Sequence, residues 1–90
     1  MDRIHEIRTR LATLEPELCE IEDESHRHAG HAGARSGGGH YRLHIVAAAF
    51  AGKNPLARHR MIHAALGSMM QAQIHALSIV ASTPEEAGLR

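Results

Sequence analysis

Apolar residues recur at intervals of three and four along two stretches of the chain, the spacing of a helix with one buried face. The longer stretch begins at Asn54, a good capping residue, followed by Pro55, which suits the first helical position because no N–H is needed there. It continues to the next strand-like run, with Gly67 as a candidate break. The residues predicted to cover a sheet are Leu56, Ile62, Ala65, Leu66 and Met69.

A shorter helix is predicted over residues 2–14. Asp2 can cap its start, and Pro16 follows its end. Its apolar positions again recur at helical spacing; they are Ile4, Ile7, Leu11 and Leu14.

Three other stretches alternate between apolar and polar residues, which is typical of half-buried strands. They cover residues 17–24, 40–49 and 73–81. In the acidic first run, Leu18 lies on one face and Cys19 and Ile21 on the other. The middle run alternates most cleanly, with Tyr41, Leu43 and Ile45 on one face and His40, Arg42 and His44 on the other.

The segments between and after these elements are rich in turn residues. Residues 25–39 form a long, flexible loop whose Gly37-Gly38-Gly39 run cannot support a helix or a strand interior. Near the end of the chain, Thr83-Pro84-Glu85-Glu86 has the form of a capping box, which predicts a short turn before the tail at 87–90.

The predicted order is helix, strand, strand, helix, strand, which gives an α+β fold. The second and third strands flank a helical crossover and should be parallel, whereas the first two should be antiparallel. The loop after the first strand and the starts of the other two strands then share one end of the sheet. The histidines expected to gather there are His26, His28, His31, His40 and His75.

Composition indicates one small domain spanning residues 1–90. Ten Lys and Arg balance ten Asp and Glu, so no overall positive field favours nucleic acid. The nine histidines provide many candidate metal ligands, while the single cysteine, Cys19, excludes an internal disulfide. No apolar stretch has the length of a membrane span, so a cytoplasmic protein without membrane contact is expected.

The sequence resembles the BolA family from about residue 3 to residue 87. The resemblance rests on Asp23-Glu24-Ser25 with the following loop, on Arg58-His59-Arg60-Met61-Ile62, and on Ile74-His75-Ala76-Leu77 followed by the capping box. It implies a two-layer fold similar to class II KH domains, with a three-stranded mixed sheet covered on one face by helices.

The resemblance further implies a non-enzymatic adaptor that pairs with a monothiol glutaredoxin and shares a [2Fe-2S] cluster with it and with glutathione. Such a protein would act in cluster trafficking or in iron and redox regulation. The family's ligand after the long helix maps onto His75 and its loop ligand onto His28, with His26 and His31 as alternatives. No cofactor is expected in the isolated chain, which should be a monomer or a weak homodimer.

The Arg58-His59-Arg60 block admits three interpretations: a solvated helix face, a partner-docking surface or a phosphate contact. Partner docking is favoured, because arginine forks bind carboxylates as well as phosphates. Some bacterial members of the family are regarded as transcription regulators, so DNA binding is the alternative. Residues 50–55 lack the Gly-x-x-Gly clamp of RNA-binding KH modules.

The other chemistry-bearing residues have simpler explanations. His26, His31 and His40 are interpreted as bystanders or weak metal ligands, and Cys19 as a half-buried structural thiol. Without the family resemblance, His75 itself would be interpreted as a histidine at the edge of the core. No catalytic set of Ser, His and Asp or of Cys and His stands out in the sequence.

Overall fold

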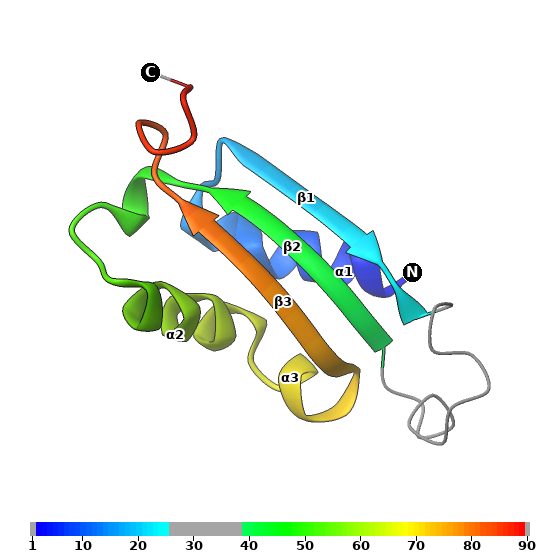
Figure 1. Cartoon of the computed structure of the whole chain (residues 1–90). Coiled ribbons are helices and arrows are strands. Elements are labelled where there is room, and N and C mark those ends of the chain that lie inside the picture. Colours follow the sequence, from blue (N-terminus) through cyan, green and yellow to red (C-terminus); the bar gives the residue numbers. More distant parts are fainter. Residues whose placement is uncertain (1, 26–38, 90) are drawn as a thin grey trace.

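The computed structural model describes residues 2–25 and 39–89. Its helices and strands follow the predicted order (Figure 1): α1 (Arg3–Leu11), η1 (Ala12–Leu14), β1 (Leu18–Asp23), β2 (Gly39–Val46), η4 (Ala48–Phe50), α2 (Pro55–Leu66), α3 (Met69–Ala72) and β3 (Ile74–Ser82). None of the described helices is long and apolar enough to cross a membrane.

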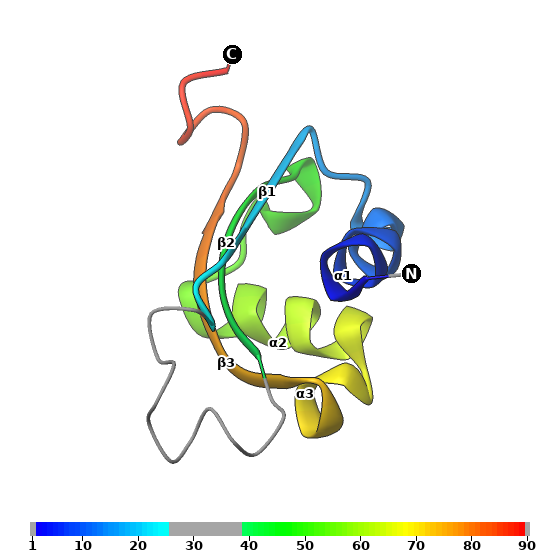
Figure 2. The ribbon, with the colours of Figure 1, turned by 90° about the vertical axis from the view of Figure 1, so that its right-hand side faces the viewer.

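The three strands form one mixed sheet in the order β1-β2-β3. β1 and β2 are antiparallel, with Asp23 opposite Tyr41, whereas β2 and β3 are parallel, with Gly39 opposite Ile74. The end of β1 and the starts of β2 and β3 therefore share one end of the sheet, as predicted. Figure 2 shows the described helices on one face of the sheet; none of them covers the opposite face, which we call the open face.

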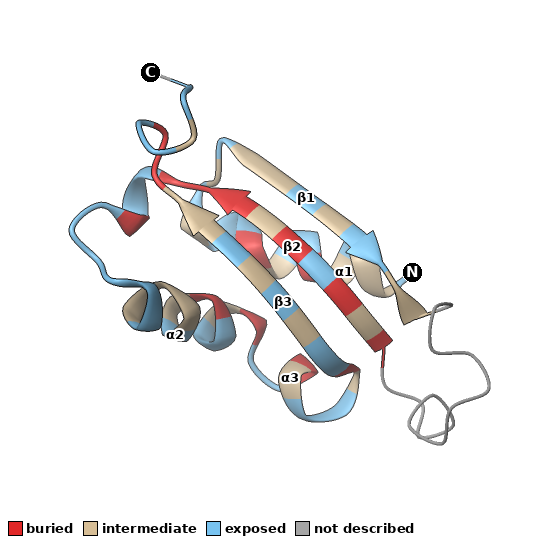
Figure 3. Ribbon diagram, in the orientation of Figure 1, coloured by how far each residue is buried: buried red, intermediate tan, exposed pale blue. Residues whose placement is uncertain are grey.

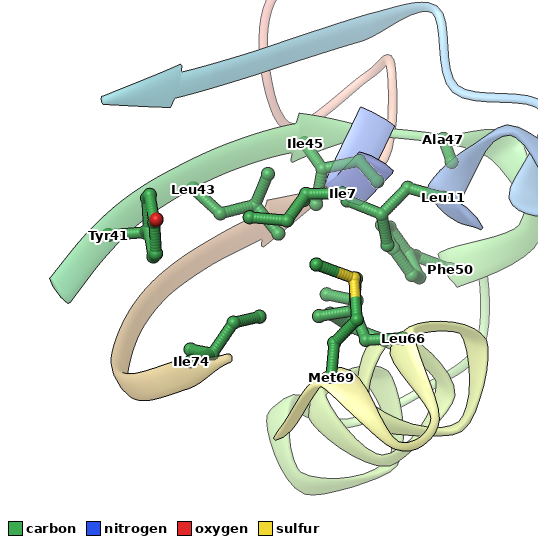
Figure 4. Close-up of a cluster of buried hydrophobic side chains, with 11 residues drawn as sticks. Ile7, Leu11, Tyr41, Leu43, Ile45, Ala47, Phe50, Leu66, Met69 and Ile74 are labelled. Carbon is green, nitrogen blue, oxygen red and sulfur yellow. The ribbon is translucent and has the colours of Figure 1, made fainter. Parts of the chain in front are cut away.

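The core lies between the sheet and the helices. The alternation predicted for β2 is confirmed, because Tyr41, Leu43 and Ile45 are buried while Arg42 is exposed (Figure 3). α1 contributes Ile7 and Leu11, and Phe50 closes the core at the end of η4 (Figure 4). On β1, Cys19 and Ile21 pack against this core, as their strand positions predicted.

The predicted apolar stripe, which runs from α2 into α3, is confirmed for four residues and wrong for the fifth. Ile62, Leu66 and Met69 are buried and Ala65 packs against them, but Leu56 is 58% exposed. At 3.6 residues per turn, Leu56 lies about 120° around the helix from Ile62, so it cannot share the same face. Position 58, four residues before Ile62, does share it, and the side chain of Arg58 is only 11% exposed.

Side chains fix the ends of α2. The Oδ1 atom of Asn54 accepts a hydrogen bond from the amide of Ala57 at 2.8 Å, which confirms the predicted cap. The helix ends at Gly67, whose φ of +57° favours glycine, so the predicted break is also confirmed. Arg10 of α1 donates to the carbonyl oxygen of Leu66 at 2.7 Å and thereby ties the two helices together.

Two predicted boundaries differ from the structure by three residues, whereas the other strand ends, including the start of β2 at Gly39, differ by one. The first helix ends at Leu11 and tightens into the 3-10 turn η1, instead of continuing as a regular helix to residue 14. β2 ends at Val46 instead of Ala49, because residues 48–50 turn to bury Phe50. Alternation of small alanines carries little information about a strand end, since their side chains fit either conformation.

The predicted capping box forms at the C-terminal end of β3. The Thr83 hydroxyl accepts from the Glu86 amide at 3.2 Å, and a Glu86 carboxylate oxygen accepts from the Thr83 amide at 3.0 Å. The Arg58 guanidinium also donates to both Glu86 carboxylate oxygens. These bonds, that from Arg58 first, lower the pKa of Glu86 from 4.5 to about 2.

Glu86→Gln should therefore remove one component of the acid sensitivity of folding. A carboxylate whose pKa is depressed on folding stabilises the protein above its ordinary pKa, and this contribution disappears as the pH falls toward the folded value. Urea unfolding should show Glu86→Gln less stable than wild type at pH 7, with the difference shrinking between pH 4.5 and about 2. Glu85→Gln is the matched control, and a pH-independent difference for Glu86→Gln would contradict the linkage.

Candidate functional site

His75 occupies an irregular position at the start of β3. Gly39 of β2 pairs with Ile74, yet the next residue, His40, pairs with Ala76, so His75 is an additional residue in the ladder. An insertion of this kind is a β-bulge, which bends the strand and redirects a side chain. Ile74 is buried in the core while His75 and Ala76 are both exposed. The bulge therefore anchors the strand through Ile74 and presents His75 to solvent.

A second imidazole lies beside His75. The ring centroids of His40 and His75 are 5.0 Å apart, with 42° between the ring planes. The backbone of His40 is fixed on both sides, because its amide donates to the Ser25 hydroxyl at 2.9 Å and its carbonyl accepts from the Glu24 amide at 2.8 Å. We call these two residues the His40–His75 pair.

The start of β2 depends on the absence of a side chain at Gly39. A Cβ atom at that position would overlap the ring of Tyr41, which lies against the glycine. Tyr41 is only 4% exposed and belongs to the core. Gly39 thus allows the tyrosine to pack beside the bulge and holds the start of β2 close to the start of β3.

Ion pairs cross the open face of the sheet between β1 and β2. Arg42 and Glu24 approach to 3.1 Å, and the Nδ1 atom of His44 lies 3.4 Å from Glu20. The second contact is an ion pair only when His44 is protonated. Glu20, Glu22, Arg42 and His44 also line a shallow depression in this region. This part of the open face carries charges of both signs.

The loop histidines His26, His28 and His31 lie outside the described residues, so their predicted roles as ligands remain predictions. Of the five histidines expected to gather at this end of the sheet, the structure brings together His40 and His75. No group of three or more His, Cys, Asp or Glu side chains suited to a metal ion occurs among residues 2–25 and 39–89.

The three residues of the Arg58-His59-Arg60 block have different surroundings. Arg58 donates to the backbone carbonyls of Lys53 and Ala81 at 2.8 and 3.0 Å, in addition to its two bonds with Glu86. It joins the start of α2 to the end of β3, so its guanidinium has a structural role. Arg60 is exposed and His59 is half-buried. These two residues keep the predicted docking role as a hypothesis.

Cys19 is a half-buried free thiol that packs against the core. Burial raises its pKa, and the nearby Arg8 opposes this effect only in part. A raised pKa disfavours the thiolate, which is the reactive and metal-binding form. The structure therefore agrees with a structural role for this cysteine.

The sequence placed His40 and His75 at the same end of the sheet, which the structure confirms, but it interpreted His40 as a bystander or weak metal ligand and did not specify the direct contact between the two rings. Strand alternation correctly placed His40 on the wet face of β2, and topology placed the start of β3 nearby. The contact also depends on the bulge, which shifts the register by one residue. No local pattern around Gln73 or Ile74 indicated that shift.

Known proteins match this sequence over most of its length. A family model described as BolA-like protein matches residues 11–86. BolA-like protein 1 from Pongo abelii is 43% identical over 91% of this chain and 58% of its own length. The DNA-binding transcriptional regulator BolA from Escherichia coli strain K12 is 36% identical over 83% of this chain and 69% of its own length.

Solved structures agree with these matches. The BolA domain of SufE1 from Arabidopsis thaliana is 44% identical and superposes with a TM-score of 0.82, covering 96% of each chain. Some relatives are much longer: this chain spans 58% of the Pongo abelii protein and 21% of SufE-like protein 1 from Arabidopsis thaliana. The family model, the sequence identities and the shared fold all give the same assignment. This chain belongs to the BolA-like protein family.

Proposed function

We propose that this chain is an adaptor that docks on a monothiol glutaredoxin and contributes imidazole ligands to a shared [2Fe-2S] cluster. The observation that carries the proposal is the exposed position of His75 on a bulge at the rim of the sheet. Similarity to the BolA domain of SufE1 supports a setting in iron–sulfur chemistry. The proposal assigns cluster trafficking or iron and redox regulation to the chain, and no catalytic step.

The residues present fit such a cluster. Within the described chain, the imidazole of His75 makes no hydrogen bond or ion pair, so a ring nitrogen is available to a metal ion. We assign the second ligand to His28, the residue indicated by the family resemblance. A cluster bound through imidazoles on one iron has a higher reduction potential than one bound by thiolates alone.

The fold supplies a rigid base and an accessible ligand. Ile74 is 3% exposed and holds the residue before His75 in the core, while the hydrogen bonds at His40 fix the neighbouring strand. A ligand placed at the rim of the sheet can reach iron held mainly by another molecule. The partner protein and glutathione would supply the remaining sulfur ligands.

Reconstitution tests the assignment of the loop ligand. The chain is mixed with a monothiol glutaredoxin, glutathione, iron and sulfide without oxygen, and visible circular dichroism is recorded. His28→Ala should shorten the lifetime of the mixed cluster by about tenfold or more, whereas His26→Ala and His31→Ala should leave it within about twofold. Equal effects of the three substitutions would remove His28 as the second ligand.

Docking of the partner is assigned to the exposed side of α2 around Arg60. Arg60→Glu should weaken binding to the apo-glutaredoxin by about tenfold at low salt, because it replaces a cation by an anion at the contact. Lys53→Glu, an equal charge reversal at an exposed residue before the helix, is the control and should change binding less. Calorimetry with the two purified proteins measures both values, and unchanged binding of Arg60→Glu would exclude this surface.

A second candidate function, DNA-binding transcription regulation, is favoured by the 36% identity to the Escherichia coli regulator. Arg60 and Lys53 would then contact phosphates, and each substitution to Gln should reduce the salt dependence of binding by about one unit of log K against log salt. Binding to a promoter fragment that vanishes near physiological salt, or that ignores both substitutions, would exclude it. The balanced net charge makes this function the less favoured one.

A further inference from the structure

Two imidazoles from different strands meet on the open face of the sheet. His40 begins the regular part of β2 and His75 is the bulge residue of β3, with ring centroids 5.0 Å apart. We propose that the His40–His75 pair binds a divalent transition-metal ion in the isolated chain, and that this ion competes with the cluster for His75. The first part stands alone, whereas the competition rests on the proposed function.

The separation of the rings suits two ligands on one ion. Zinc lies about 2.0–2.1 Å from each imidazole nitrogen. When the angle between the two zinc–nitrogen bonds ranges from a right angle to the tetrahedral angle, the two ring centroids lie roughly 4.5–5.2 Å apart. The observed 5.0 Å lies inside this range.

The backbone on both sides of the pair is already ordered. The His40 amide and carbonyl are bonded to Ser25 and Glu24, and the Nε2 atom of His40 is buried, so the surrounding atoms constrain the ring. His75 is held on the bulge by the buried Ile74. A site whose ligands are fixed in advance loses less conformational entropy when the ion binds.

The charges around the pair do not oppose a cation. Arg42 is the nearest arginine along β2, and its guanidinium is paired with the Glu24 carboxylate at 3.1 Å. The Glu24 side chain is mostly buried, with 15% of it exposed, whereas the Arg42 side chain is 55% exposed. The carboxylate offsets the arginine charge close to His40.

The ligand type selects the class of ion. Imidazole nitrogens favour zinc, nickel and copper, whereas magnesium and calcium prefer oxygen ligands. The one thiol, Cys19, packs on the opposite, core-facing side of the sheet, so it cannot be a third ligand of this ion. Water would complete the coordination shell, since no third protein ligand is present among the described residues.

Zinc titration of the full chain, with no partner present, tests the site. To remove the histidine ligands of the loop, His26, His28 and His31 are all changed to Asn. Zinc binding is then measured by calorimetry and by NMR of the remaining histidine rings. Zinc should still bind, and the ring signals of His40 and His75 should shift first. In this background, His40→Phe should weaken binding by about tenfold or more, because phenylalanine keeps the ring contact but has no nitrogen.

Two matched variants make the outcome decisive. His44→Phe changes a histidine on the same strand and face and should leave zinc affinity within about twofold of the background. His59→Ala removes one of two histidines four residues apart on α2, an alternative metal-binding pair, and should also have little effect. Zinc binding that survives His40→Phe, is lost with the loop histidines, or is lost in His59→Ala would overturn the proposal.

The competition is tested with the wild-type chain and the glutaredoxin cluster. Zinc added in advance should slow formation of the mixed cluster in proportion to its occupancy, and His40→Phe should relieve this inhibition while still forming the cluster. Inhibition that is unchanged in His40→Phe would overturn the competition. If wild type forms no mixed cluster even without zinc, the proposed function and the competition fail together, and the zinc titration decides the site alone.

Discussion

Replacing His75 with alanine should abolish the visible circular dichroism signature of the mixed cluster without destabilising the chain. The side chain is exposed and makes no hydrogen bond in the described structure, so the free energy of unfolding should change by no more than about 0.5 kcal/mol. Loss of a direct ligand should shorten the lifetime of the mixed cluster by more than about tenfold, or leave only the glutaredoxin homodimer cluster.

His44→Ala is the matched control for His75→Ala. It removes a histidine from the same face of the sheet but leaves the rim intact, so its cluster spectrum should equal that of wild type. Urea unfolding of both variants separates ligand loss from misfolding. A His75→Ala spectrum identical to wild type would contradict the assignment of this ligand.

The largest effect on stability is expected for Leu66→Ala, compared with Leu56→Ala in the same helix. Leu66 is fully buried, whereas Leu56 is 58% exposed. Truncating a buried leucine removes apolar burial and leaves a cavity, which costs about 2–5 kcal/mol. A domain of this size has about 5–15 kcal/mol of stability at most, so Leu66→Ala should lose a large part of it.

Leu56→Ala should change the free energy of unfolding by less than about 0.5 kcal/mol, because the side chain is largely in water in both states. Urea denaturation at constant pH measures both variants with the same change in side chain. Similar losses for the two would mean that the first turn of α2 also covers the core, contrary to the structure.

The elements with strong local signals were predictable from sequence. Asn54-Pro55 marked the start of α2, Gly67 its end, and the alternation around Leu43 gave the inward face of β2. The parallel arrangement of β2 and β3 followed from the crossover rule, which also brought the rim histidines to one end of the sheet. Each of these features depends on a few neighbouring residues or on a general rule of topology.

The details that failed depend on three-dimensional packing. Leu56 is apolar and close to the stripe in sequence, yet its angle around the helix turns it outward, while Arg58 points inward to join Glu86 and Ala81. His40 and His75 were expected at the same end of the sheet, but their direct contact depends on a one-residue bulge between β2 and β3 that the sequence did not indicate. Long-range register of this kind is set by the whole sheet and is not contained in either strand alone.

The central claim is that His75 of this chain ligates iron in the shared cluster. The most direct measurement is pulsed electron paramagnetic resonance of the reduced mixed cluster, with ¹⁵N-histidine incorporated only into this chain. The account predicts a strong ¹⁵N coupling that disappears in His75→Ala and persists in His44→Ala. A cluster that forms between the two proteins but shows no coupling to nitrogen of this chain would contradict it.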